Sequence, residues 1–185
     1  MHRFWLWLAA VLLLSGVSPG VTSAQEKASE TDVKAAFLYN FAKFVEWPNS
    51  PNRTLDSTFR IGVAGRTAIN KAIKAAVDNK QVAGRRVEIV ESDDAKELLD
   101  CNIVFINSSS PTAMEAMLTA LRGHPVLTVS EHEEFISYGG MIRFFVADGK
   151  VRFEISPEKA RGERLNISSK LLKLAVIADS YGGTE

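Results

Sequence analysis

The sequence predicts a single α/β domain in which a mostly parallel sheet is flanked by helices and ends in a C-terminal antiparallel hairpin. Strand-like segments alternate with helix-like segments between residues 59 and 136. Such alternation is typical of β-α units, whose strands lie parallel because each helix carries the chain back across the sheet. The pattern then changes to two strand-like runs around Asp148-Gly149, a dipeptide typical of a tight hairpin turn. We therefore expect a mixed sheet with helices on both faces.

The first 24 residues have the layout of a secretory signal peptide. Arg3 supplies a positive charge, residues 4–14 are apolar, and small residues end the segment at Ala24. A helix that spans a membrane needs about 20 apolar residues, more than this run provides. We expect export into the periplasm of a Gram-negative envelope, cleavage after Ala24 and a mature domain over residues 25–185. The alternative is that the segment stays in place as an anchor.

An aromatic helix opens the expected mature domain. Ser29, followed three residues later by Asp32, is typical of a helix N-cap, and Pro48 disfavours continuation beyond Trp47. Between these limits apolar side chains recur on one broad face. They are Phe37, Leu38, Phe41, Phe44 and Val45. We expect a helix to about residue 45 with its phenylalanines buried.

The rim of this helix is a candidate partner surface. An aromatic stripe at helical spacing is more often core than docking face, so the buried side is not a candidate. Tyr39 and Trp47 are expected closer to the rim, and Lys43 lies on the polar side. The candidate partner-binding residues are therefore Tyr39, Lys43 and Trp47.

Four strand segments, each followed by a helical segment, come next. The expected strands cover residues 59–63, 86–90, 103–106 and 125–129. The expected helices cover residues 67–77, 93–99, 111–121 and 131–136. Hydroxyl side chains precede three of these helices, and we expect Ser92, Ser110 and Ser130 to be their N-caps.

The C-terminal part is expected to hold a hairpin and a closing helix. Residues 141–146 and 151–155 flank the turn at Asp148-Gly149. Ser168 precedes a segment with an apolar side, which predicts a helix over residues 169–180.

Composition and cysteine content limit the partners and the covalent or metal links that this chain can have. The 22 basic and 22 acidic residues balance, and no basic stripe occurs, so nothing favours nucleic acid as a partner. Cys101 is the only cysteine, which excludes an intrachain disulfide and a cysteine metal cluster. Because it adjoins the apolar run 103–106, we expect a buried thiol, with an intermolecular disulfide as the alternative.

Polar residues follow three of the predicted strands, at the edge where open parallel sheets usually bind ligands. Their hydroxyl, amide and guanidinium groups, together with helix N–H groups, suit a small anion or another polar solute. The candidate ligand-binding residues are Arg66, Thr67, Asn107, Ser108, Ser109, Ser130 and His132. The alternative is that the Ser, Thr and Asn side chains serve only to cap helices.

No catalytic or cofactor motif occurs in the sequence. The patterns GxGxxG, GxxxxGK[ST], GxSxG, HExxH and CxxC are all absent. His132 with Glu131 or Glu134 could hold a metal loosely, but such acidic neighbours are typical of a solvated face. We expect a protein that binds rather than catalyses, without cofactor or metal. A hydrolase that uses His132 is an alternative.

The opening helix carries a resemblance to a known family. Residues 33–48, VKAAFLYNFAKFVEWP, resemble the opening signature of YfiR-like proteins. Shorter segments fit the same family in order along the chain. They are residues 101–106, 125–130, 135–140, 151–155 and 167–172.

The resemblance implies a periplasmic regulator that represses a membrane-bound diguanylate cyclase through its periplasmic portion, and so controls cyclic-di-GMP and biofilm formation. It also implies a homodimer. Related proteins carry cysteine pairs, and Cys101 departs from that pattern because it is the only cysteine. The alternative is a periplasmic module that binds a small solute and serves a sensor or transporter.

Overall fold

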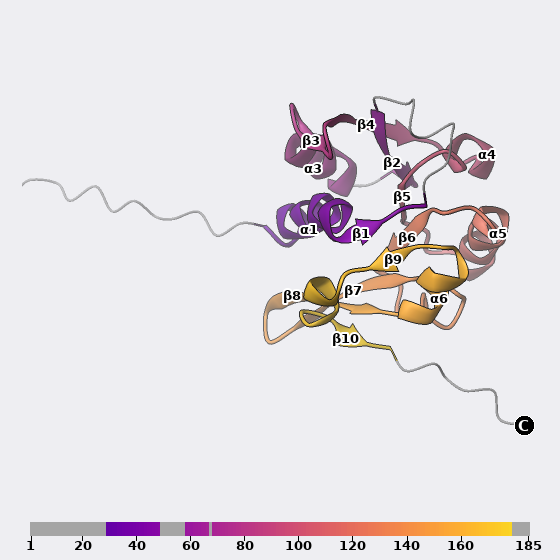
Figure 1. Ribbon diagram of the computed structural model, residues 1–185. Helices are drawn as coiled ribbons and strands as arrows, with labels where there is room; N and C mark the ends of the chain where they lie inside the picture. Colours follow the sequence, from indigo (N-terminus) through magenta and orange to yellow (C-terminus); the bar gives the residue numbers. More distant parts are fainter. Residues whose placement is uncertain (1–28, 49–57, 67, 179–185) are drawn as a thin grey trace, which may run out of the picture.

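The computed structural model describes residues 29–48, 58–66 and 68–178 of the 185-residue chain. The predicted signal peptide lies outside the described residues. Within them the chain forms a mixed sheet with helices on both faces, which confirms the predicted fold class (Figure 1). Among the described residues, none of the helices combines the length and the apolar character that a bilayer crossing requires.

In the described residues the main sheet has eight strands. They are β2 (Thr58–Ala64), β3 (Gln81–Val82), β4 (Arg85–Glu91), β5 (Ile103–Ile106), β6 (Leu127–Ser130), β7 (Ile142–Ala147), β8 (Lys150–Ile155) and β10 (Val176–Ile177). Their order is β10-β8-β7-β6-β5-β2-β4-β3. The run from β4 to β7 is parallel, whereas β8 is antiparallel to β7 and β3 is antiparallel to β4. Strand β2, the first of these strands along the chain, therefore lies inside the sheet, with β4 on one side and β5 on the other.

The predicted hairpin is confirmed. Strands β7 and β8 pair antiparallel from Ile142 with Ile155 to Ala147 with Lys150. Asp148 and Gly149 between them have φ angles of 53° and 66°. Two successive residues with positive φ match the twist of an antiparallel pair, which is why Asp-Gly favours this turn.

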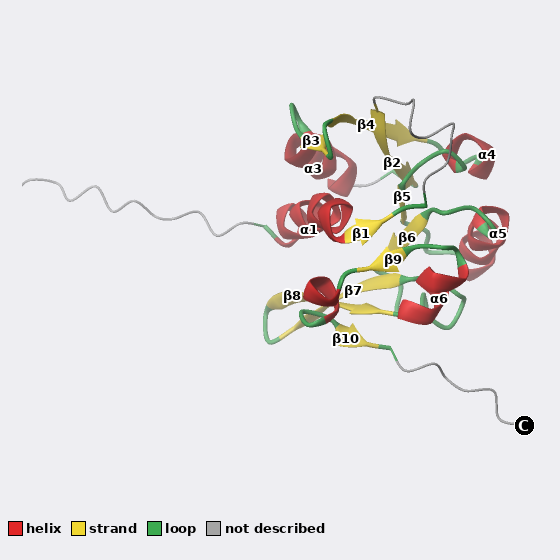
Figure 2. Ribbon diagram, in the orientation of Figure 1, coloured by secondary structure: helices red, strands yellow, loops and turns green. Residues whose placement is uncertain are grey.

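Helices cover both faces of the sheet (Figure 2). They are α1 (Glu30–Phe44), α3 (Ala68–Val77), α4 (Ala95–Leu98), α5 (Pro111–Leu121), α6 (Pro157–Gly162) and α7 (Ser169–Leu172). The buried side chains of α1 and α3 belong to one core, and those of α4 and α5 belong to a second core. Two N-caps are as predicted: Ser29 Oγ accepts from the Asp32 N–H at 3.1 Å, and Ser110 Oγ accepts from the Ala113 N–H at 3.3 Å.

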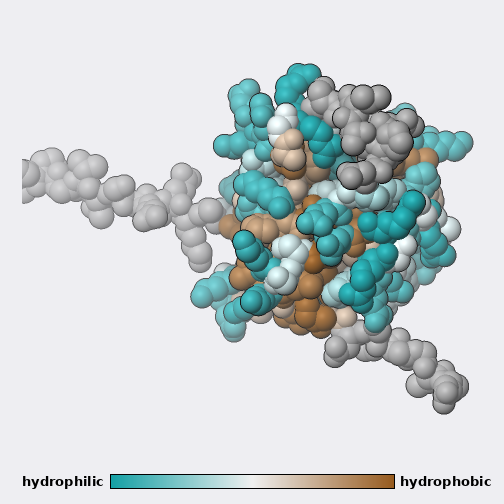
Figure 3. All heavy atoms as spheres, in the orientation of Figure 1, coloured by the Kyte–Doolittle hydropathy of each residue, from teal (hydrophilic) through white to brown (hydrophobic). Residues whose placement is uncertain are grey.

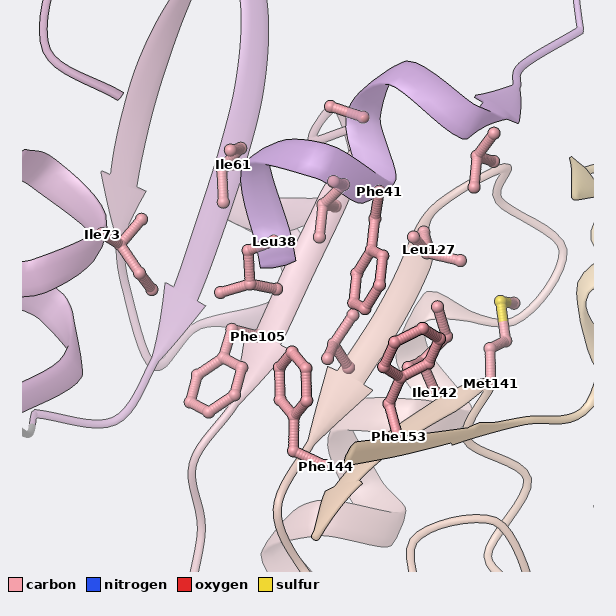
Figure 4. Packing of buried hydrophobic residues seen from close by; sticks show 14 of the residues in the cluster. Leu38, Phe41, Ile61, Ile73, Phe105, Leu127, Met141, Ile142, Phe144 and Phe153 are labelled. Atoms are coloured by element: carbon pink, nitrogen blue, oxygen red, sulfur yellow. The ribbon is translucent and has the colours of Figure 1, made fainter. Parts of the chain in front are cut away.

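Aromatic side chains join α1 to the hairpin in the first core (Figure 4). The fully buried Phe41 ring lies 5.6 Å from Phe144 and 5.2 Å from Phe153, measured between ring centroids. Phe37 and Phe44 are only partly buried, so the expectation that every phenylalanine of the helix is buried was too broad. The second core contains Cys101, whose side chain is fully buried as predicted.

A small second sheet ties the end of α1 to the C-terminal part. Strand β1 (Val45–Glu46) pairs antiparallel with β9 (Asn166–Ile167). Asn166 donates its amide N–H to the Glu46 carboxylate at 2.9 Å, and the Ser168 N–H donates to the Phe44 carbonyl at 2.9 Å. These long-range pairs were not predicted, because two-residue strands leave no periodic pattern in a sequence.

The predicted closing helix over residues 169–180 was wrong. Of residues 169–178, which the structure describes, only the four of α7 are helical, and Val176 and Ile177 form β10, which is parallel to β8. Ser168 stands at the N-cap position but caps no backbone N–H of the described residues with its side chain. The β-branched pair at 176–177 suits a strand, and pairing with β8 satisfies backbone groups that a sheet edge would leave exposed.

Two smaller predictions also need correction, and one short helix was missed. The predicted helix over residues 131–136 was wrong, because residues 131–132 have no regular structure and residues 133–136 form turns. Asp94, and not Ser92, caps α4, since the Asp94 carboxylate accepts from the Lys96 N–H at 2.9 Å. The helix α6 was not predicted, although Ser156-Pro157 is a common helix start. Such short helices depend on tertiary packing more than on propensity, because helix initiation is costly.

Candidate functional site

The carboxyl ends of β2 and β5 meet at the point where the strand order reverses, a common ligand site in open α/β sheets. Here the two strand ends pack tightly against each other. A side chain added at Gly65, whose φ is +93°, would place its Cβ 2.2 Å from the Asn107 carbonyl oxygen. The Asn107 N–H donates to the Ala64 carbonyl at 2.9 Å. The backbone itself therefore occupies the space between these two strands.

The polar residues after β5 bond locally. Ser108 Oγ accepts from the Ser110 N–H at 3.2 Å, and Ser110 caps α5. Ser109 is exposed beside them. For Ser108 and Ser110 the structure thus favours the capping interpretation over a ligand role.

The polar residues after β6 are likewise engaged by the protein. Ser130 is almost fully buried, and its Oγ donates to the Ile106 carbonyl at 2.6 Å and accepts from the His132 N–H at 3.2 Å. His132 Nδ1 accepts from the Glu134 N–H at 3.3 Å, and its ring lies edge-on to Tyr138. The described residues contain no group of three or more His, Cys, Asp or Glu side chains placed to hold a metal ion.

A buried lysine covers the end of β6. Lys34 of α1 is only 7% exposed, and its Nζ donates to Glu131 Oε2 at 2.7 Å and to the Glu30 carboxylate one helical turn away. Burial would lower the pKa of Lys34, but the hydrogen bonds and charges of Glu131 and Glu30 outweigh it, so the pKa lies above its ordinary value of 10.5. This ammonium fixes the first turn of α1 to the rim of the sheet.

Lys34 is expected to make stability fall at alkaline pH. The folded state holds the proton more tightly than the unfolded chain, so the contribution is fully present below pH 10.5 and is lost as pH rises through the raised pKa. Urea unfolding of the Lys34→Met variant should show a loss of about 1 kcal/mol at neutral pH. Above pH 10.5 the difference from wild type should shrink. A constant difference across this range would contradict the assignment.

A cavity of about 640 Å³ lies on the other side of β2, against β4 and α3. Nine of the described residues line it. They are Val63, Gly65, Arg66, Asn70, Lys71, Lys74, Glu91, Ser92 and Asp93. Of the candidate ligand residues only Arg66 is among them; Thr67 lies outside the described residues, and Asn107, Ser108, Ser109, Ser130 and His132 do not line the cavity.

Sequence reasoning missed the β4 side of this cavity. The polar run Glu91-Ser92-Asp93 follows the predicted strand 86–90 in the same way as the polar runs that follow the other three predicted strands. The polar positions of the predicted helix 67–77, Asn70, Lys71 and Lys74, were a second available sign. Their proximity depends on β4 being the neighbour of β2, which the sequence pattern does not specify.

Hydrogen bonds organise the acidic side of the cavity. Glu91 accepts from Lys74 at 2.7 Å and from the Asn70 amide at 2.8 Å, and Asp93 accepts from the Gly65 N–H at 2.8 Å. The hydrogen bonds from Lys74 and Asn70, with the nearby charge of Arg66, lower the pKa of Glu91. The carboxylate is therefore ionised at neutral pH and already serves two donors of the protein.

The three candidate partner residues make contacts within the fold. The Tyr39 hydroxyl donates to the Gln81 carbonyl at 3.1 Å, and Lys43 Nζ lies 4.1 Å from the centre of the Tyr39 ring. Trp47 Nε1 donates to the Asn102 carbonyl at 3.1 Å, and its ring packs edge-on against Phe59. These contacts account for Tyr39 and Trp47 without a partner.

Comparison with known proteins identifies the family. Residues 31–176 match the family described as YfiR/HmsC-like, a range that takes in all but the first residue of α1 and all but the last residue of β10. The chain belongs to the YfiR/HmsC-like family. The sequence resemblance is thereby confirmed.

Two solved structures are similar to parts of this chain. One is a conserved domain protein from Vibrio cholerae, 9% identical, with a TM-score of 0.51 over 82% of this chain and 60% of that one. The other is an ABC domain in complex with L-Trp from Streptococcus pneumonia, 12% identical, with a TM-score of 0.47 over 65% of this chain and 55% of that one. This YfiR/HmsC-like chain thus spans little more than half of each solved protein, and at such identities the likeness concerns the fold alone.

Proposed function

We propose that this YfiR/HmsC-like protein is an exported periplasmic regulator that binds the periplasmic portion of a membrane-bound diguanylate cyclase and represses it without catalysing a reaction. Family membership over residues 31–176 is the observation that carries the proposal. Repression follows if the regulator binds the inactive state of the cyclase more tightly than the active state, because binding then shifts the population toward inactivity.

The contact surface that we propose is the outer strand of the main sheet, β10, near the C-terminus. Three large apolar side chains are exposed there: Leu174 at 71%, Val176 at 50% and Ile177 at 44%. Apolar surface gathers at this end of the molecule, over α7 and β10 (Figure 3). Neighbouring exposed apolar side chains of this size are typical of interaction sites.

The backbone of this edge adds to the argument. In the described part of the chain, β10 is the last strand of the sheet and pairs only with β8, on one side. Its other side can accept an extended segment of a partner, a recognised mode of peptide binding that also uses apolar side chains of alternate strand positions. We infer that the cyclase contributes an extended apolar segment. This edge replaces Tyr39, Lys43 and Trp47 as the proposed partner site.

A deletion strain complemented with variants tests the proposal. Loss of the gene should raise the cellular level of cyclic-di-GMP, and reintroducing the wild-type gene should bring that level down again. The Val176→Lys variant should fail to lower the cyclic-di-GMP level, since a charge is costly in an apolar contact.

Val146→Lys is the matched control. Val146 is also 50% exposed, but it pairs with Val151 at the other end of the hairpin. This variant should restore repression fully. An unchanged cyclic-di-GMP level in the deletion strain would refute the regulatory proposal, whereas full repression by Val176→Lys would refute only the surface. If Val176→Lys instead turns a dimer into a monomer in gel filtration, the edge is occupied by a second copy.

A further inference from the structure

We propose that the cavity between β2, β4 and α3 binds a small oxyanion, a solute that carries a carboxylate or a phosphate group. This inference does not depend on the proposed regulation of a cyclase. The cavity adjoins β4, near one end of the sheet, whereas the apolar edge β10 forms the other end.

The charges that line the cavity favour an anion. Arg66, Lys71 and Lys74 supply three cations, against the two carboxylates of Glu91 and Asp93. Both carboxylates already accept hydrogen bonds from the protein, Glu91 from Lys74 and Asn70, and Asp93 from Gly65. A cationic ligand would have to compete with these donors. An anion would meet the guanidinium of Arg66 and the ammonium of Lys71, which are both exposed at the cavity wall.

Asn70 and Glu91 hold the lining of the cavity in position. Asn70, only 8% exposed, joins the loop after β2 to β4, because its amide donates to both the Gly65 carbonyl and Glu91. Glu91 holds Lys74 at 2.7 Å. The cavity walls are thus fixed to each other before a ligand arrives, which lowers the entropic cost of binding.

Geometry and size narrow the ligand class. A guanidinium offers two parallel N–H groups that match a carboxylate or a phosphate, while an ammonium adds a point charge. A volume of about 640 Å³ suits a small organic anion as well as inorganic phosphate. A neutral sugar would leave the excess positive charge of the lining, three cations against two carboxylates, without a counter-charge.

Titration calorimetry of the purified protein tests the site, with citrate and inorganic phosphate as separate probes and glucose as the neutral control, all at fixed ionic strength. We expect saturable binding of at least one anion and none of glucose. Arg66→Ala and Lys71→Ala should each weaken that binding about tenfold or more, the effect of one charge-assisted hydrogen bond. Arg66→Lys should weaken it less than Arg66→Ala does.

Arg86→Ala is the matched control, because Arg86 is exposed near the opposite end of the same strand β4 and does not line the cavity. It should leave the affinity unchanged. Amide shifts of Gly65, Ser92 and Asp93 in NMR spectra of the wild-type protein give a second measurement that needs no variant. The proposal is overturned if neither anion binds at millimolar concentration, if Arg86→Ala weakens binding as much as Arg66→Ala, or if the shifted amides lie elsewhere.

Discussion

The Phe41→Ala variant should lose about 4 kcal/mol of unfolding free energy and melt about 10 °C lower than the wild-type protein. Phe41 is fully buried and packs against Phe37, Phe144 and Phe153. Its removal deletes apolar contacts and leaves a cavity between α1 and the hairpin, which neighbours of this size cannot fill. Urea denaturation and thermal melting measure the loss.

Leu174→Ala is the control for this prediction. It removes an apolar side chain that is 71% exposed, so the unfolding free energy should change by less than about 0.5 kcal/mol. A loss below about 1 kcal/mol for Phe41→Ala would mean that α1 does not pack on the sheet as described.

The Gly65→Ala variant should lose about 3 kcal/mol for two separate reasons. The φ of +93° at Gly65 is unfavourable for any side chain, and the new Cβ would lie 2.2 Å from the Asn107 carbonyl oxygen. That oxygen belongs to the backbone, so it can move only if β2 and β5 separate. We expect the strain to reach the cavity as well, because the Gly65 N–H and carbonyl bond to Asp93 and Asn70.

Gly139→Ala separates the two causes. Gly139 has a similar φ of +98°, but a Cβ there would meet nothing within 4 Å. This variant should lose only the conformational part, about 1 kcal/mol. Equal losses in both variants, measured by urea unfolding, would show that the contact with Asn107 costs nothing.

The two proposed functions occupy different parts of one sheet. The apolar edge at β10 follows the hairpin, whereas the charged cavity lies beside β4. Binding at one can therefore be abolished without touching residues of the other. Combining Arg66→Ala with the complementation experiment will show whether an anion changes repression.

Local patterns in the sequence determined much of this protein. The N-cap at Ser29, the aromatic face of α1, the turn at Asp148-Gly149 and the buried thiol of Cys101 were all predictable. Each depends on neighbours within a few residues or on simple burial of an apolar segment. The alternation of strands and helices likewise fixed the fold class, because parallel strands need helical connections.

Tertiary structure alone decided the rest. Val176 and Ile177 became a strand because the edge of β8 was available to pair with them, and no local pattern reports such an edge. The cavity formed beside β4 because β4 and β5 flank β2, and the backbone of Asn107 fills the space on the β5 side. Which polar residues cap helices and which face a ligand depends on that neighbour order, since it sets which strand ends meet.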